Sequence, residues 1–323
     1  MTATASAVKG AARYRHEALF YEDGRDFLAA VAAFVRHGMA TGEPTMVVLE
    51  APKLDALRAE LRGDSRAQGA PLVLADMATV GGNPARIIPA WRRFVDEHGA
   101  GGRPVRGVGE AISAGRPPAE LVECQLHEVL LNVAFAPDAP FHLVCPYNTT
   151  TLSGPVLEEA RRSHAFVRFG ASCSTPSADY RACPTPDVLF RSPLPEPTPP
   201  VAVERFGRSD LTELRHRVRR TACEAGLGER ADDVALAVHE AAANSVRHGG
   251  GGGDLRTWVD DGALVFEVSN PGRFDDVLAG RIAPKPEDPS GRGMWLMNHV
   301  CDLVQVRNTP AGAVVRLHVR AHA

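Results

Sequence analysis

A polar stripe near residue 240 is spaced to place chemistry on one face of a helix. The stretch from His239 to Gly249 reads HEAAANSVRHG, and Glu240, Asn244 and His248 follow one another at intervals of four. Residues four apart share a helix face, and the apolar residues lie elsewhere, so this stripe faces a cavity or water. A carboxylate there can act as a general base or orient a hydroxyl, and an amide oxygen suits Mg²⁺.

The same stripe is open to a plainer interpretation. Taken alone, an E-x-x-x-N pair is more often a solvated helix face than a site. Zinc-protease chemistry of the HExxH kind would need a histidine where Ala243 stands, so that class of enzyme is excluded.

Two glycine-containing loops follow this helix, at residues 270–274 (NPGRF) and 290–294 (SGRGM). A Gly-x-Gly turn at the start of a helix presents backbone N–H groups and the positive end of the helix dipole, which favour an anion such as phosphate. Most such turns are only tight turns. The order of the motifs is more informative: E-x-x-x-N helix, strand, N-x-G turn, long segment, GxG turn, helix.

This order resembles the GHKL ATPase superfamily, and most closely its RsbW-type branch of anti-sigma-factor serine kinases. The resemblance covers about residues 201–320 and implies a two-layer α+β fold that binds ATP and Mg²⁺. It implies that Asn244 holds Mg²⁺, that Glu240 activates a substrate hydroxyl, and that residues 275–290 form the ATP lid. The residues that it implies for nucleotide binding are Asn244, His248, Asn270, Gly272, Gly291, Arg292, Gly293 and Met294.

The adenine-reading motif departs from the family pattern D-x-G-x-G. Asn270 stands in place of the aspartate and Phe274 in place of the second glycine. An asparagine oxygen can accept a hydrogen bond from the adenine amine, but without charge that bond has about half the strength of a charge-assisted one. The NH₂ group of Asn270 can also turn toward a different base. The sequence therefore predicts weak or altered ATP binding and leaves open whether kinase activity is retained.

The first half of the chain carries a second group of polar residues. The segments HEALFY (16–21), HEVLLN (127–132), CPYN (145–148) and ARRSH (160–164) resemble the MEDS sensory domain. That resemblance covers about residues 16–180 and implies a RecA-like α/β fold used for sensing. The candidates for a sensory pocket are His16, Glu17, His127, Glu128, Cys145 and His164.

Other interpretations of these residues stay open. His127 and Glu128 can face solvent or satisfy each other. Cys145 and His164 can belong to a metal site, although no pair of ligands has metal-binding spacing. The remaining cysteines are interpreted as ordinary free thiols, because the chain contains no CxxC pair.

Two different patterns of elements indicate two domains. Before residue 183, apolar strands at 18–21, 45–49, 72–74, 105–108 and 141–145 alternate with amphipathic helices, which predicts a mostly parallel α/β sheet. After residue 200, a strand at 201–206, two helices, a hairpin at Asp261-Gly262, a third helix at 293–301 and two final strands predict an antiparallel α+β domain.

A proline-rich stretch separates the two patterns. Seven prolines lie between residues 184 and 200, and proline fixes φ and removes a backbone donor, so an extended linker is expected. A long loop within one domain is the alternative. The predicted boundaries are 1–183 for the sensory domain, with 1–15 disordered, then 184–200 for the linker and 201–323 for the ATPase-like domain.

Composition limits the location and the partners. The net charge of −3 over 323 residues provides no field for direct nucleic-acid binding. No stretch approaches the roughly 18 apolar residues of a membrane span, and residues 1–15 lack the apolar core of a signal peptide. A cytoplasmic protein is therefore expected.

The pairing of the two domains resembles the RsbA family of anti-sigma regulators. It implies transcription control by partner switching, as in stress responses. The chain would sequester a sigma factor and phosphorylate a serine or threonine of an anti-anti-sigma (STAS-domain) protein. RsbW-type kinases are often dimeric, so a homodimer is implied too.

Two alternatives belong to other classes. One is a non-catalytic protein-binding module with a degenerate nucleotide site. The other is a sensor histidine kinase, for which His216 is the candidate acceptor, although it lies between Arg215 and Arg217 and lacks an acidic neighbour. The resemblance implies that a small molecule or another signal acts on the N-terminal domain.

Overall fold

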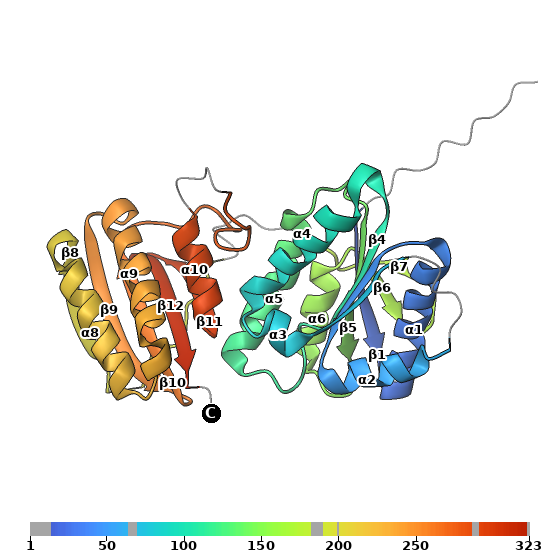
Figure 1. Cartoon of the computed structure of the whole chain (residues 1–323), viewed down its shortest axis with the longest axis horizontal. Helices are drawn as coiled ribbons and strands as arrows, with labels where there is room; N and C mark the ends of the chain where they lie inside the picture. Colours follow the sequence, from blue (N-terminus) through green and yellow to red (C-terminus); the bar gives the residue numbers. More distant parts are fainter. Residues whose placement is uncertain (1–13, 64–69, 182–189, 199, 286–290, 322–323) are drawn as a thin grey trace, which may run out of the picture. The chain divides into compact units, whose positions relative to one another are not determined.

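Two sheets organise the chain, one formed by strands β1–β7 and the other by β8–β12 (Figure 1). The computed structural model describes residues 14–63, 70–181, 190–198, 200–285 and 291–321. These residues divide into two compact units, each built around one of the sheets.

The seven-stranded sheet has the order β3-β2-β4-β5-β1-β6-β7. Every pairing is parallel except that of β6 with β7. The predicted mostly parallel α/β fold is therefore confirmed. The strands are β1 (Arg15–Tyr21), β2 (Thr45–Leu49), β3 (Leu72–Asp76), β4 (Val105–Gly109), β5 (Phe141–Asn148), β6 (Phe166–Phe169) and β7 (Thr175–Pro176).

Helices connect these parallel strands. Asp23 caps the first helix, because its side chain accepts hydrogen bonds from the backbone N–H groups of Arg25 and Asp26. The helix at 154–163 was not predicted, because only Val156 and Ala160 among its apolar residues are buried. The helices are α1 (Gly24–Thr41), α2 (Ala51–Glu60), α3 (Met77–Gly81), α4 (Ile87–His98), α5 (Pro118–Ala134) and α6 (Gly154–Ser163).

Alternation along β1 places consecutive residues on opposite faces of the sheet. Leu19 and Tyr21 pack with α1 and α2 in one core cluster, and Glu17 shares their face. The carboxylate of Glu17 accepts a hydrogen bond from His142 Nε2 at 2.9 Å and lies 3.0 Å from Arg168 Nε. His16 points to the other face, where its ring lies against that of His164.

The five-stranded sheet has the order β11-β12-β10-β9-β8, and each neighbouring pair is antiparallel. At the predicted hairpin, Asp261 and Gly262 both have positive φ, as a type I′ turn requires. The strands are β8 (Ala202–Gly207), β9 (Gly252–Asp260), β10 (Ala263–Asn270), β11 (Leu303–Thr309) and β12 (Gly312–Arg320).

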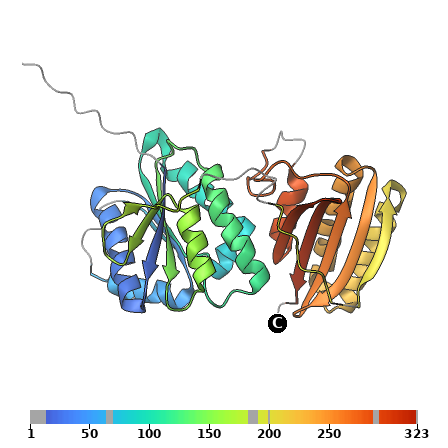
Figure 2. The same cartoon turned by 180° about the vertical axis from the view of Figure 1, so that it is seen from behind.

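Three helices cover one face of this sheet, as Figure 2 shows from behind. Side chains of all three enter a single core cluster with Phe266, Val268 and Leu317 of the sheet. This arrangement confirms the predicted antiparallel α+β fold. The helices are α8 (Leu211–Glu224), α9 (Ala231–His248) and α10 (Arg292–Val300).

Several expectations concern residues at the margins of the described ranges. The sequence predicts disorder for residues 1–15. Residues 1–13 lie outside the described ranges, whereas Arg15 begins strand β1. Residues 182–189 and 199 of the proline-rich region also lie outside them. Among the described residues, no helix is both long and apolar enough to cross a membrane.

The ion cluster around Glu17 predicts a pH-dependent stability. Burial alone raises the pKa of Glu17, but the hydrogen bond from His142 and the charges of Arg168, His142 and Arg15 outweigh it and lower the pKa from 4.5 to about 2. The pKa of His142 is itself lowered, because the effect of burial outweighs the opposing effect of Glu17. Ionised Glu17 therefore stabilises the fold fully above pH 4.5, and this contribution is lost as the pH falls toward 2.

We expect Glu17→Gln to lower the free energy of unfolding by about 3 kcal/mol at neutral pH. The loss should shrink as the pH falls through that window, since the protonated wild-type carboxyl no longer pairs with Arg168. Urea unfolding followed by circular dichroism at several pH values measures it, with the exposed Glu22→Gln as the control. A destabilisation that does not change with pH would contradict the prediction.

Candidate functional site

A cavity of about 740 Å³ lies on the helix-covered face of the five-stranded sheet. It is bounded by the C-terminal half of α9, the loop after β10 and the start of α10. All nine residues that the sequence predicted for catalysis or nucleotide binding line it: Glu240, Asn244, His248, Asn270, Gly272, Gly291, Arg292, Gly293 and Met294.

The polar stripe of α9 faces this cavity, because the opposite side of the helix is buried in the core. The side chain of Glu240 is 27% exposed, and its Oε2 lies 3.7 Å from Arg247 Nη2. The same guanidinium donates a hydrogen bond to Asn244 Oδ1 at 3.2 Å. Arg247 was not predicted as a site residue, yet it contacts the oxygens of both predicted functional groups.

Gly293 brings the first turn of α10 close to these side chains. A Cβ atom at this position would lie 2.7 Å from Glu240 Oε2 and 3.4 Å from Asn244 Nδ2. Only a glycine allows this approach without moving the carboxylate. The start of α10, where backbone N–H groups favour an anion, therefore lies directly against Glu240 and Asn244.

Alternation along β10 places Asn270 on the same face as Phe266 and Val268, toward α9. Its Nδ2 donates to Ser245 Oγ at 2.9 Å, and its Oδ1 accepts from the backbone N–H of Gly272 at 2.8 Å. The Ser245 hydroxyl in turn donates to the carbonyl of Ala241 at 3.1 Å. These bonds fix which end of the amide faces which neighbour. Ser245 was not predicted, although it adjoins Asn244 in the motif.

The loop after β10 is held by a side chain from β11. Asn308 Oδ1 accepts from the backbone N–H of Phe274 at 2.9 Å, and Asn308 Nδ2 donates to the Phe274 carbonyl at 2.8 Å. The ring of Phe274 packs against the core. The predicted lid begins at Asp275, and residues 286–290 of it lie outside the described ranges.

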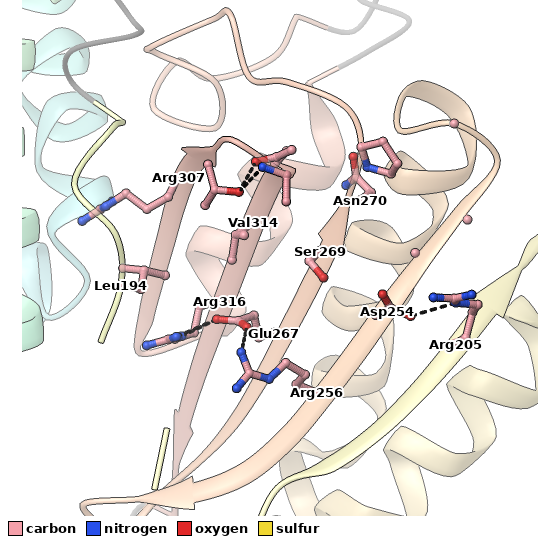
Figure 3. A pocket seen from close by; sticks show the side chains of 18 of the residues that line it. Leu194, Arg205, Asp254, Arg256, Glu267, Ser269, Asn270, Arg307, Val314 and Arg316 are labelled. Atoms are coloured by element: carbon pink, nitrogen blue, oxygen red, sulfur yellow. Dashed lines mark hydrogen bonds and ion pairs between the residues drawn. The ribbon is translucent and has the colours of Figure 1, made fainter. Parts of the chain in front are cut away.

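A second cavity, of about 820 Å³, lies on the other face of the same sheet (Figure 3). Most of its charged side chains already pair with one another. Glu267 lies 3.0 Å from Arg256 Nη1 and 2.6 Å from Arg316 Nη2, and Arg205 lies 3.1 Å from Asp254. Although it is larger, this cavity contains Asn270 alone of the nine predicted residues, so we assign the candidate site to the smaller one.

The other sheet brings together four of the six residues predicted for a sensory pocket. The ligand atoms of His16, Glu128, Cys145 and His164 all lie within 4.8 Å of one another. Glu17 does not join them, because alternation along β1 turns it to the other face. His127 is buried on α5 but is not part of the group.

Two family models match the chain. The MEDS model (methanogen/methylotroph, DcmR sensory domain) covers residues 15–165. The histidine kinase-like ATPase domain model covers residues 208–319. The chain combines a MEDS domain with a histidine kinase-like ATPase domain. No curated protein matched the sequence.

The cavity of the ATPase domain fits a magnesium nucleotide. Its volume of about 740 Å³ lies within the usual range for small-molecule sites. Asn244 offers an oxygen ligand of the kind that Mg²⁺ accepts. Because residue 293 is a glycine, no side chain from α10 fills the space beside Asn244. The predicted role of each residue in binding remains a prediction.

The MEDS domain also contains a polar cluster that the sequence did not reveal. Lys53 Nζ lies 2.6 Å from each carboxylate oxygen of Glu110, and the Tyr21 hydroxyl donates to Glu110 at 2.6 Å. These residues meet near the carboxyl ends of β1 and β4, where ligands commonly bind in parallel sheets. Only the fold places them together, because they are 32 to 89 residues apart.

We expect Gly293→Ala to weaken nucleotide binding by about tenfold or more without unfolding the domain. The added methyl would displace Glu240, whereas alanine favours a helix over glycine. Calorimetric titration with Mg-ATP and a thermal melt measure the two effects. Gly228→Ala, which has no atom within 4 Å of the new Cβ, is the control. Unchanged nucleotide affinity in Gly293→Ala would contradict the assignment of this cavity.

Proposed function

We propose that the chain is an anti-sigma regulator whose ATPase domain binds Mg-ATP, sequesters a sigma factor and phosphorylates a serine or threonine of an anti-anti-sigma (STAS-domain) partner. The MEDS domain would control this activity in response to a signal. One observation carries the proposal: Glu240 and Asn244 face the same cavity as the N-terminus of α10, so close to Gly293 that a methyl group there would displace the Glu240 carboxylate.

The proposed chemistry divides between the side chains of α9. Bound ATP supplies the phosphoryl group, and Mg²⁺ offsets the phosphate charge. Asn244 would hold the metal through Oδ1, and Glu240 would accept the proton of the partner's hydroxyl. Arg247 now donates to Asn244 Oδ1. It must therefore share that oxygen with the metal or turn toward the phosphates.

Glu240→Gln tests whether Glu240 accepts the proton while Asn244 holds the metal. Glutamine keeps the shape of the side chain but cannot take a proton, so phosphate transfer to the STAS partner should fall by about 10²–10⁴-fold. Nucleotide affinity should change by less than about threefold. A transfer assay with labelled ATP measures the first quantity and calorimetry the second, with Glu224→Gln on α8 as the control. Equal transfer by wild type and Glu240→Gln would refute the proposed base.

A non-catalytic module is the second candidate, and the contacts of Asn270 favour it. Both polar ends of its amide already bond within the protein, to Ser245 and Gly272. If adenine is not read there, the site is degenerate and the chain acts by sequestration alone. Absence of heat with Mg-ATP, together with tight binding of a sigma factor, would support this candidate over the first.

Asn270→Asp separates the two candidates further. The Oδ1 atom keeps one lone pair beyond its bond to Gly272, and a charged acceptor would bind the adenine amine about 1 kcal/mol more strongly. We expect ATP affinity to rise roughly fivefold, provided that the Ser245 hydroxyl turns to donate to the new carboxylate. GTP, which lacks that amine, is the control ligand. An unchanged ratio of ATP to GTP affinity would show that residue 270 does not contact the base.

A further inference from the structure

The four-residue group of the MEDS domain consists entirely of metal-ligating side chains. His16, Glu128, Cys145 and His164 are each no more than 3% exposed, and their ligand atoms lie within 4.8 Å of one another. Two imidazoles, a thiolate and a carboxylate are all ligands that zinc accepts. Exposed acidic clusters are common without a metal, but this group is buried and contains one acid only.

The tautomer of His16 is set by its neighbours. Asn132 Nδ2 donates to the carbonyl of Ser163 at 2.7 Å, so its Oδ1 is the acceptor that lies 3.1 Å from His16 Nδ1. Nδ1 therefore carries the proton. The lone pair is on Nε2, which lies 3.4 Å from Cys145 Sγ.

The tautomer of His164 is set in the same way. Its Nδ1 lies 2.8 Å from the carbonyl oxygen of Ala160, and a carbonyl can only accept. Nδ1 again carries the proton, which leaves the lone pair on Nε2. Metal-binding histidines characteristically donate from the other ring nitrogen to a carbonyl or amide oxygen, which fixes ring and tautomer. Both histidines have that arrangement.

We propose that His16, Cys145, His164 and Glu128 bind a divalent transition metal, with Zn²⁺ the ion that this set of ligands favours. Bond lengths of about 2.0–2.3 Å in a tetrahedral site place ligand atoms roughly 3.3–3.7 Å apart. The pair of His16 Nε2 and Cys145 Sγ is already at 3.4 Å. The widest pair, within 4.8 Å, needs to close by about 1 Å, which side-chain rotation can supply.

The summed charge of the four side chains supports a divalent ion at this buried position. Two neutral imidazoles, one thiolate and one carboxylate balance a divalent cation, so the occupied site carries no net charge into the interior. On binding, Cys145 loses its proton to solvent and the metal–sulfur bond forms, with no change in oxidation state. This site is independent of the function proposed for the ATPase domain.

Cobalt titration of the full-length chain, first stripped of metal with a chelator, tests the site. Wild type is expected to bind one equivalent of Co²⁺ with a thiolate-to-metal charge-transfer band and visible bands of tetrahedral intensity. One equivalent of Zn²⁺ should abolish them. Cys145→Ser should lose the charge-transfer band and weaken Zn²⁺ binding by tenfold or more, while Cys173→Ser, which changes an exposed cysteine, should match wild type.

Asn132→Leu provides a second variant that leaves every ligand in place. Loss of the hydrogen bond to His16 should weaken Zn²⁺ binding by about 10–100-fold while the charge-transfer band survives at saturating Co²⁺. Circular dichroism confirms the fold of each variant. The proposal is overturned if folded wild type shows no tetrahedral cobalt spectrum, if Cys173→Ser rather than Cys145→Ser removes the band, or if Asn132→Leu binds Zn²⁺ as tightly as wild type.

Discussion

The one-sided burial of helix α9 is the constraint on which the ATPase domain depends. Ala237, Ala241 and Ala242 have small side chains that let the helix lie close to α8, α10 and the sheet. With that side buried, the polar stripe can face only the cavity. Charges at the helix ends agree with this placement, because Asp232 and Asp233 lie in the first turn and Arg247 in the last.

Close packing around α9 also limits which side chains can stand at the glycines beside Asn270. A Cβ at Gly249 would overlap Asn270 Oδ1, and one at Gly272 would lie 2.7 Å from the same atom. The asparagine side chain thus fills the space that two glycines leave. Ser245 completes the contact from the helix side. Residue 270 therefore joins the sheet to α9 whether or not it also contacts a base.

Much of the fold was predictable because its elements have strong local signals. Apolar runs such as Thr45–Leu49 became buried parallel strands, and Asp261-Gly262 formed the expected turn. The weakly apolar helix α6 and the short strand β6 had no such signal. The position of β1 between β5 and β6 was not predictable either, since strand order depends on contacts between distant segments.

How well each site could be predicted depends on how close together its residues lie in the sequence. In the ATPase domain, Glu240 and Asn244 lie on one helix, so a spacing of four predicted their shared face. In the MEDS domain, His16 and Cys145 are 129 residues apart and meet only because β1 pairs with β5. The sequence grouped Glu17 with His16 as neighbours, but in a strand neighbours face opposite ways. Only the arrangement of the sheet shows which four of the six candidates lie together.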